Sequence, residues 1–264
     1  MTTPARTVPA PAFRGVLLDW RGTLVVAPTY RWLVATALAR VGRRADDADV
    51  ERVLGALRGT DSTRVRSSQI DTDVDEHRAA YADWFRAAGL DDDLAAALYA
   101  VESDVSLNAF AHDVGSLLVA LAEAGVRVGV VSDVHVDLRP TFASHLLPDG
   151  RSWADLVHTW ALSFELGIAK PDPAIFRAAL DGLDLPAAEV LMVGDRGGWD
   201  GAAVDLGMTT LLLPPLADPA EERLHRVLHL VLPGGPRVGD GGAPLRHLVL
   251  ENGTSQVLGG TPLP

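Results

Sequence analysis

Short apolar runs alternate with stretches of helical periodicity along most of the chain. The apolar runs lie at residues 16–18, 126–133, 156–163, 189–195 and 209–214. Each is short and nearly continuous in apolar residues, which is typical of a strand that is buried on both faces. Helical patterns over 113–125 and 197–207 lead into the second and the fifth of these runs. The alternation predicts an α/β fold with a doubly wound parallel sheet.

Residues 28–108, between the first and the second predicted strand, follow a different pattern. Helical periodicity occurs four times in this block, at 29–41, 47–58, 71–88 and 91–104, and no strand pattern interrupts it. We therefore expect an all-helical insertion over the sheet, which we call the cap. The sheet core would consist of residues 13–27 and 109–231.

The two ends of the chain lack such patterns. Residues 1–12 have no apolar stretch of the kind that a signal peptide needs, and we expect a flexible leader. Residues 232–264 are rich in glycine and proline. They predict a tail that is mobile or lies along the surface, with one short strand at Leu248–Glu251.

Composition and charge disfavour several classes of partner. No apolar run reaches the ~18–20 residues of a membrane-spanning helix. The 264 residues include 35 acidic and 23 basic ones, which gives a net charge of −12. Because phosphate backbones and anionic membranes attract basic surfaces, we expect neither nucleic acid nor a membrane as a partner. The absence of cysteine excludes disulfides and thiolate metal sites, and a cytoplasmic location is the default expectation.

Polar residues stand where the predicted strands end. Asp19 follows the first strand, Ser132 and Asp133 end the second, and Asp195 ends the fourth. Ligands of open α/β sheets bind at the carboxyl ends of the strands. These side chains should therefore converge on one site.

Two loops at this edge have the composition of an ion-binding site. In DWRGT, Gly22 would let backbone N–H groups approach an anion, and Thr23 adds a hydroxyl. In VGDRGGWD, the carboxylates of Asp195 and Asp200 could flank a magnesium ion. Asp200 could instead cap the helix that follows it.

Ser132 and Lys170 would complete an anion site. Ser132 ends its strand with a hydroxyl and begins a turn of N–H groups, which suits a phosphate oxygen or an ordinary helix cap. Lysine occurs once in the chain, at position 170, against 22 arginines. A compact ammonium group can pair with a carboxylate and a phosphate oxygen together, where the wider guanidinium would crowd them.

These segments, in this order, resemble the four motifs of the haloacid dehalogenase superfamily. LLDWRGTLV is similar to the first motif, DxDGT, and GVVSD to the second. GIAKPDPAIF resembles the third motif, which contains the lysine, and VLMVGDRGGWDGAAVDLG resembles the fourth, GDxxxxD. The resemblance spans residues 13–231 and implies a Rossmann-like core with a type 1 helical cap.

The resemblance also implies magnesium-dependent phosphoryl transfer, in which Asp19 would be the nucleophile that forms an aspartyl-phosphate. The metal ligands would be Asp19, Asp195, Asp200 and the backbone carbonyl of Arg21. The residues that contact a small phosphorylated substrate would be Gly22, Thr23, Ser132, Asp133 and Lys170. The last of these would also restrain the nucleophile.

Arg21 departs from the family pattern. Phosphatases of the family usually have an aspartate there, which protonates the leaving oxygen and activates water. Arginine stays protonated and is a poor proton donor or acceptor, so metal binding can survive while this proton transfer is lost. His135, three residues after Ser132, could supply the proton, or it could be an ordinary histidine on a helix surface.

Two other activities of the family are disfavoured. Its dehalogenases typically carry tyrosine at the position of Arg21 and a Ser-Asn pair where this chain has Ser132 and Asp133. Its phosphonate hydrolases use a lysine of the cap, and residues 28–108 contain none.

Three hypotheses remain. The first is a magnesium-dependent phosphatase that acts on a small phosphorylated metabolite. The second is an enzyme restricted to acyl or aryl phosphates, whose leaving groups need no acid, or a phosphotransferase. The third is a catalytically weak homologue that binds a phosphorylated ligand and uses Arg21 as an anion clamp. Substrate choice would lie in the cap, where the residues that could face the cleft are Arg31, Trp32, Arg64 and Arg66.

Overall fold

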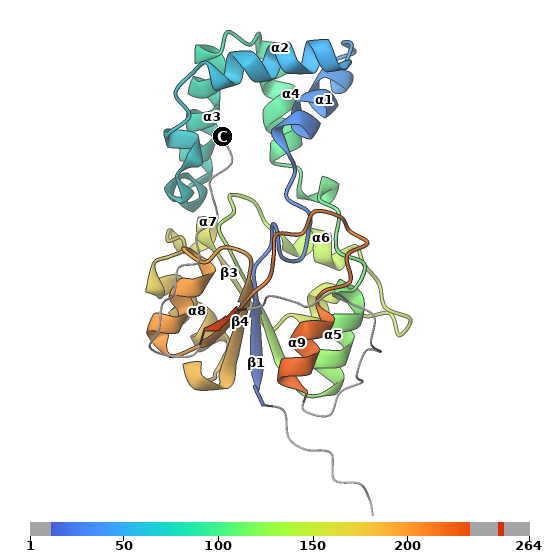
Figure 1. Cartoon of the computed structure of the whole chain (residues 1–264), viewed down its shortest axis with the longest axis vertical. Helices are drawn as coiled ribbons and strands as arrows, with labels where there is room; N and C mark the ends of the chain where they lie inside the picture. The colour runs from blue at the N-terminus through green and yellow to red at the C-terminus, as the bar shows by residue number, and fades with distance from the viewer. Residues whose placement is uncertain (1–11, 233–247, 251–264) are drawn as a thin grey trace, which may run out of the picture.

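A computed structural model of the chain describes residues 12–232 and 248–250. These residues form one six-stranded sheet in the order β3-β2-β1-β4-β5-β6 (Figure 1). The strands are β1 (Gly15–Leu18), β2 (Arg127–Ser132), β3 (Thr159–Leu162), β4 (Val190–Gly194), β5 (Thr209–Leu212) and β6 (Leu248–Leu250). The first five are parallel, and β6 pairs antiparallel with β5. The predicted Rossmann-like, doubly wound parallel sheet is confirmed, and the strand order reverses between β1 and β4.

Successive residues of a strand point to opposite faces of the sheet, so each face has its own apolar layer. The helices of the sheet core are α5 (Val114–Glu123), α6 (Arg139–Ala143), α7 (Ser163–Leu166), α8 (Pro173–Leu183) and α9 (His225–Val231). Val16 and Leu18 of β1 are buried in the layer of α5 and α9, whereas Leu17 is buried in the layer of α8. Figure 1 shows α8 on one side of the sheet and α5 and α9 on the other. Because β1 packs against both apolar layers, the position of its carboxyl end is fixed.

Four helices form the cap, which lies beyond the carboxyl ends of the strands (Figure 1). They are α1 (Tyr30–Arg40), α2 (Asp47–Arg58), α3 (Val74–Ala87) and α4 (Asp92–Glu102). Each begins after a side chain that accepts an N–H of its first turn, from Thr29, Asp46, Asp73 or Asp91. The helices enclose an apolar cluster of their own, distinct from the two layers of the sheet.

Short 3₁₀ segments connect these elements. They are η1 (Arg64–Arg66), η2 (Ser68–Thr72), η3 (Val105–Leu107), η4 (Trp153–Leu156), η5 (Ala187–Glu189) and η6 (Asp200–Leu206). Three of them change a predicted boundary or type. Helix α3 begins at Val74 because η2 and the capping Asp73 precede it. Strand β3 begins at Thr159 because η4 occupies the start of the apolar run, and η6 replaces the helix predicted over 197–207.

None of the helices in the described ranges is long and apolar enough to cross a bilayer. The predicted leader and most of the predicted tail lie outside those ranges. Within the tail, β6 confirms the first three residues of the short strand that was predicted over Leu248–Glu251.

Candidate active site

The carboxyl ends of the central strands open into a cavity of about 230 Å³ below the cap. From the core it is lined by Asp19, Arg21, Ser132, Asp133, Lys170, Arg196 and Trp199. From the cap it is lined by Val65, Arg66, Ser67, Ser68 and Asp71. The structure thus brings three of the predicted strand-end residues, Asp19, Ser132 and Asp133, into one cavity with Lys170.

Lys170 is the centre of the charge arrangement. Its side chain is 4% exposed, and Nζ donates to Asp19 Oδ1 at 2.6 Å and to Asp200 Oδ1 at 2.7 Å. Burial acts to lower the pKa of Lys170, but the carboxylates of Asp19 and Asp200 outweigh burial and raise it. The ammonium group therefore stays charged at any ordinary pH and stabilises two buried carboxylates.

Asp19 is held in a fixed orientation at the end of β1. Its backbone N–H donates to the carbonyl of Val193 at 2.9 Å, and the Thr23 hydroxyl donates to its Oδ2 at 3.1 Å. Burial raises the pKa of Asp19 to about 6 despite the opposing charge of Lys170. The Asp19 carboxylate is thus buried and contacts one ammonium group, that of Lys170. A carboxylate with little water around it suits a nucleophile, and a second positive charge beside it can assist the attack.

Asp200 shapes the loop that follows β4. It is fully buried, and its Oδ2 accepts the backbone N–H groups of Asp195 at 3.1 Å and Arg196 at 2.9 Å. Its Oδ1 accepts from Lys170. Both oxygens of Asp200 are therefore already engaged, so this residue orients the loop and the lysine.

The acidic residues around this point fit a magnesium ion. Asp19, Asp195 and Asp200 offer carboxylate oxygens that lie within 4.8 Å of one another. Asp195 Oδ1 is buried and has no hydrogen-bond partner among the described residues. Burial first, and then the charges of Asp19 and Asp200, raise the pKa of Asp195 to about 7. A divalent cation that prefers oxygen ligands would relieve this repulsion.

The expectation that Gly22 and Thr23 contact the substrate is revised. The N–H of Gly22 donates to the carbonyl of Val25 at 2.8 Å, and that of Thr23 donates to Trp20 at 3.2 Å, so neither is free for an anion. Gly22 has a φ of +84°, and a Cβ there would lie 2.3 Å from Asp195 Oδ2. The glycine is needed because the turn passes close to that carboxylate, and these two residues position the site without lining its cavity.

Ser132 and Asp133 lie where the sequence places them, at the end of β2. Ser132 is buried and lines the cavity. Asp133 also lines it, but its Oδ1 accepts the backbone N–H of Lys170 at 2.8 Å. Burial raises the pKa of Asp133 to about 6. Asp133 therefore anchors the loop that carries the lysine.

Arg21 lines the cavity, but its guanidinium is bound to the cap. Nε donates to Asn108 Oδ1 at 3.1 Å, Nη1 to Glu102 Oε1 at 3.1 Å, and Nη2 to the Glu102 carbonyl at 3.0 Å. The Glu102 side chain, at the end of α4, is only 6% exposed. Arg21 thus compensates a buried carboxylate where the cap meets the core.

Of the cap residues that line the site, only Arg66 was a candidate from the sequence. Asp71 and Ser68 line the cavity from η2, and no local pattern distinguishes them from other polar residues of the cap. Of the arginines considered, Arg66 lines the cavity, whereas Arg64 pairs with acidic residues of α3. His135 is 3% exposed in the loop after β2 and does not line the cavity, so it is not the surface histidine that was considered.

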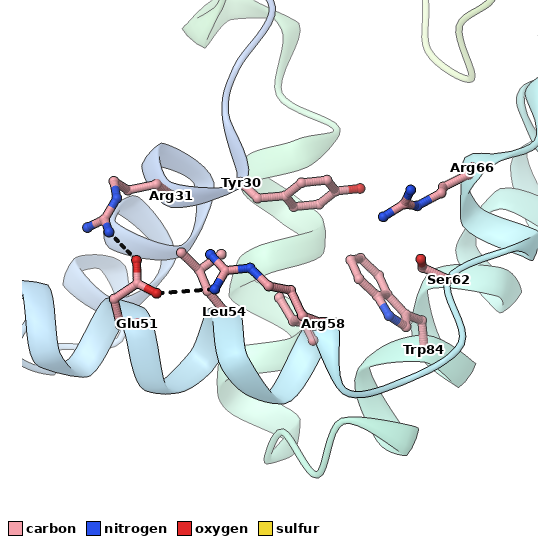
Figure 2. Close-up of a pocket in the computed structure, with 9 residues that line it drawn as sticks. Tyr30, Arg31, Glu51, Leu54, Arg58, Ser62, Arg66 and Trp84 are labelled. Atoms are coloured by element: carbon pink, nitrogen blue, oxygen red, sulfur yellow. Dashed lines mark hydrogen bonds and ion pairs between the residues drawn. The ribbon is translucent and has the colours of Figure 1, made fainter. Parts of the chain in front are cut away.

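A second cavity of about 460 Å³ lies within the cap (Figure 2). Its walls combine apolar and aromatic side chains with arginines: Tyr30, Arg31, Glu51, Leu54, Leu57, Arg58, Ser62, Arg66 and Trp84. Figure 2 shows Arg66 across from Tyr30 and near Trp84, whereas Arg31 and Arg58 are bound to Glu51. Arg66 lines both cavities, so one arginine lies between them.

Comparison with curated proteins finds a partial relative. The chain is 39% identical over 80 residues to a phosphoglycolate phosphatase of Rhodospirillum rubrum. The match covers 30% of this chain and 31% of that protein, so the chain matches less than a third of the relative's length.

Solved structures share the fold at low identity. A dehalogenase crystal structure has a TM-score of 0.58 at 21% identity and covers 84% of this chain and 98% of that one. A HAD family enzyme from Bacteroides thetaiotaomicron, in complex with magnesium and inorganic phosphate, has a TM-score of 0.55 at 18% identity and covers 78% and 96%. A 2-haloacid dehalogenase from Pseudomonas syringae pv. Tomato has a TM-score of 0.52 at 22% identity and covers 75% and 85%.

The family itself follows from the match over the sheet core and the cap together. A model described as haloacid dehalogenase-like hydrolase matches residues 13–204, which is well over half of the chain. That range contains all four strand-end motifs and the helical insertion. The chain belongs to the haloacid dehalogenase-like hydrolase family.

Proposed function

We propose that the protein is a magnesium-dependent phosphatase that acts on a small phosphorylated metabolite through a phosphoryl group on Asp19. The observation that supports this most is the contact of one buried ammonium group, on Lys170, with both Asp19 and Asp200, beside the unpartnered oxygen of Asp195. Attack by a carboxylate on a phosphoryl dianion brings two negative groups together, so it needs positive charge at that point. Lys170 supplies one charge, and the acidic cluster suits a cation that supplies the other.

Each residue at the strand ends has a role in this proposal. Magnesium would offset part of the charge on the phosphoryl oxygens when bound. Asp19, Asp195 and the backbone carbonyl of Arg21 would hold it, and Asp200 would act through the loop or through a water. Ser132 would donate its hydroxyl to a phosphoryl oxygen, and Lys170 would contact the same group while it restrains the nucleophile. Together these groups orient the phosphate for attack by Asp19.

Arg21 supports one alternative. Its guanidinium is engaged with Glu102 and Asn108, and a guanidinium is a poor proton donor or acceptor. An enzyme that found no other proton donor would be restricted to aryl or acyl phosphates, whose leaving groups need no acid, or would pass the phosphoryl group to another acceptor. A phosphate-binding homologue with little turnover would show binding without product.

We infer that the organic part of the substrate extends from the phosphate site toward the cap cavity. Arg66 lines both cavities and has no ion-pair partner among the described residues, so it could meet a second anionic group of the substrate. The partial relative from Rhodospirillum rubrum is named for a substrate that combines a phosphate with a carboxylate, which makes phosphoglycolate a first compound to test. A cytoplasmic location remains part of the proposal.

The test is phosphate release from a panel of phosphorylated metabolites, with p-nitrophenyl phosphate and phosphoglycolate included, with and without magnesium. The wild type should release phosphate only with the metal. Asp19→Asn should lower turnover by about 10³-fold or more, because the attacking oxygen is lost. Asp181→Asn, an exposed aspartate on α8, is the matched control and should behave as the wild type.

Full turnover in Asp19→Asn would contradict the proposal. Turnover that is independent of magnesium would remove the metal from the proposal. Transfer of phosphate to an added alcohol, or binding of the panel without turnover, would favour the alternatives.

A further inference from the structure

The cap places one carboxyl group over the site. Asp71, in η2, lines the cavity that contains Asp19. The Ser68 hydroxyl donates to the carbonyl of Lys170 at 3.3 Å, and the Ser163 hydroxyl donates to the backbone carbonyl of Asp71 at 2.8 Å. Both contacts join η2 to the sheet core, and neither uses the Asp71 carboxyl. The carboxyl is therefore held in place and remains available.

The proposed reaction needs an acid on this side of the phosphate. In an in-line displacement, the leaving oxygen lies opposite the attacking oxygen. Asp19 would attack from the edge of the sheet, so the leaving oxygen would point toward the cap. Asp19, Asp71 and Asp133 are the acidic residues of the described cavity lining, and Asp133 is bound to the N–H of Lys170. Asp71 is the one that the cap contributes.

Two stacked imidazole rings lie behind Asp71. The ring centroids of His77 and His135 are 3.4 Å apart, and the ring planes differ by 12°. Asp71 Oδ1 lies 3.6 Å from His77 Nε2 and 3.7 Å from His135 Nδ1. On the far side, His135 Nε2 lies 3.4 Å from Glu102 Oε2 and 3.0 Å from the Ser103 hydroxyl. His135 therefore links the carboxyl over the site to the buried carboxylate that Arg21 compensates.

Proton chemistry fits this cluster better than a metal ion. Oxygen and nitrogen atoms of Asp71, His77 and His135 are close enough to surround a cation. However, a metal lies near the plane of each imidazole that binds it, and two nearly parallel rings stacked at 3.4 Å share no such point. Burial, and then the neighbouring His135, lower the pKa of His77 to about 3, so this ring stays neutral and the stack can form.

We propose that Asp71 is the general acid and base of the reaction, in place of a carboxylate at position 21, and that His135 positions it. This proposal rests on the proposed phosphatase function. As the bond from phosphorus to the leaving oxygen breaks and the bond to Asp19 forms, the proton of the Asp71 carboxyl passes to the leaving oxygen. The Asp71 carboxylate then takes a proton from a water molecule whose oxygen bonds to phosphorus as the bond from phosphorus to Asp19 breaks. Phosphate leaves, and both aspartates return to their starting states.

The test compares two leaving groups in Asp71→Asn. The value of kcat/KM reports phosphoryl transfer to Asp19, which needs an acid for glycerol phosphate and hardly any for p-nitrophenyl phosphate. We expect kcat/KM to fall about 10²–10⁴-fold for glycerol phosphate and only a few-fold for p-nitrophenyl phosphate. Because the second step loses its base, p-nitrophenyl phosphate should also give a burst of nitrophenol as phosphoryl enzyme accumulates. Asp75→Asn, an exposed aspartate of α3, is the matched control.

The outcomes separate this proposal from the function on which it rests. An equal fall for both esters, or no fall for either, would overturn the role of Asp71 while wild-type turnover and its loss in Asp19→Asn would still stand. A wild type without magnesium-dependent turnover would overturn both. His135→Phe keeps a ring in the stack but removes both nitrogens, and we expect the same selective loss to a smaller extent. An equal loss for both esters would show that His135 only supports the fold.

Discussion

The pairing of Arg21 with Glu102 makes a prediction about stability. In Arg21→Met the side chain stays long and apolar, but three hydrogen bonds and the positive charge are lost. Glu102, whose side chain is 6% exposed, would then lack the partner of its Oε1. Removing one partner of a fully buried ion pair costs about 3–5 kcal/mol, because the other charge stays desolvated.

The exposure of the arginine reduces this cost. The Arg21 side chain is 32% exposed, so water can reach part of the space that the guanidinium leaves. We therefore expect Arg21→Met to lower the free energy of unfolding by about 2–3 kcal/mol. For a chain of this size that corresponds to a fall in Tm of about 4–12 °C.

A double-mutant cycle tests the cause. Unfolding in urea should be followed by tryptophan fluorescence and circular dichroism for Arg21→Met, Glu102→Gln and the double variant. Glutamine removes the buried charge, so the double variant should regain more than half of the stability that Arg21→Met loses. If the double variant is as unstable as the sum of the single ones, or if Arg21→Met costs less than about 0.5 kcal/mol, the arginine does not compensate Glu102.

Three further predictions concern the charged site. Gly22→Ala should abolish the rise in Tm that magnesium gives, because a Cβ at this position would lie 2.3 Å from Asp195 Oδ2. Gly42→Ala is the control and should keep that rise in Tm, because Gly42 also has a positive φ but no atom lies within 4 Å of its added Cβ. Lys170→Arg should lower kcat by about 10²-fold or more although it keeps the charge, since two carboxylates already lie 2.6 and 2.7 Å from Nζ in a buried site. Without metal, the raised pKa values of Asp19 and Asp195, about 6 and about 7, mean that the folded chain holds more protons than the unfolded chain between about pH 4 and 7. The contribution of these two carboxyls to stability is therefore present at low pH and lost as the pH rises through about 7. Magnesium must displace these protons in order to bind, so it should raise Tm more at about pH 8 than at about pH 5.5. An equal rise at both values would show that these carboxyls do not bind the metal.

The sheet and its strand-end residues could be predicted because their signals are local. A buried strand needs only a short apolar run, and a carboxylate directly after that run must lie at the edge of the sheet. Lys170 was noticeable because no other lysine exists in the chain. The family resemblance implied its contact with Asp19, whereas its contact with Asp200, which was expected to bind the metal or cap a helix, was not predicted.

The contacts between the cap and the sheet core could not be predicted from local sequence patterns. Glu102 and Arg21 are far apart in the sequence, and so are Asp71 and His135. Which cap residues face the core depends on how η2 packs against it through the hydroxyls of Ser68 and Ser163, and no periodicity encodes that. Gly22 was expected to let backbone N–H groups approach an anion, but its own N–H donates to the carbonyl of Val25 within the turn.

The single lysine, which is buried, can also be used to measure how often the site is exposed to solvent. Amine-reactive reagents acylate neutral, solvent-accessible amines, and the Nζ of Lys170 is buried and charged in this structure. Acylation of Lys170, followed by peptide mass spectrometry, would measure how often this buried amine becomes exposed. Because the chain has no other lysine, one peptide carries the signal, and its acylation rate divided by that of a free lysine gives the opening equilibrium. A bound phosphate analogue should slow this acylation.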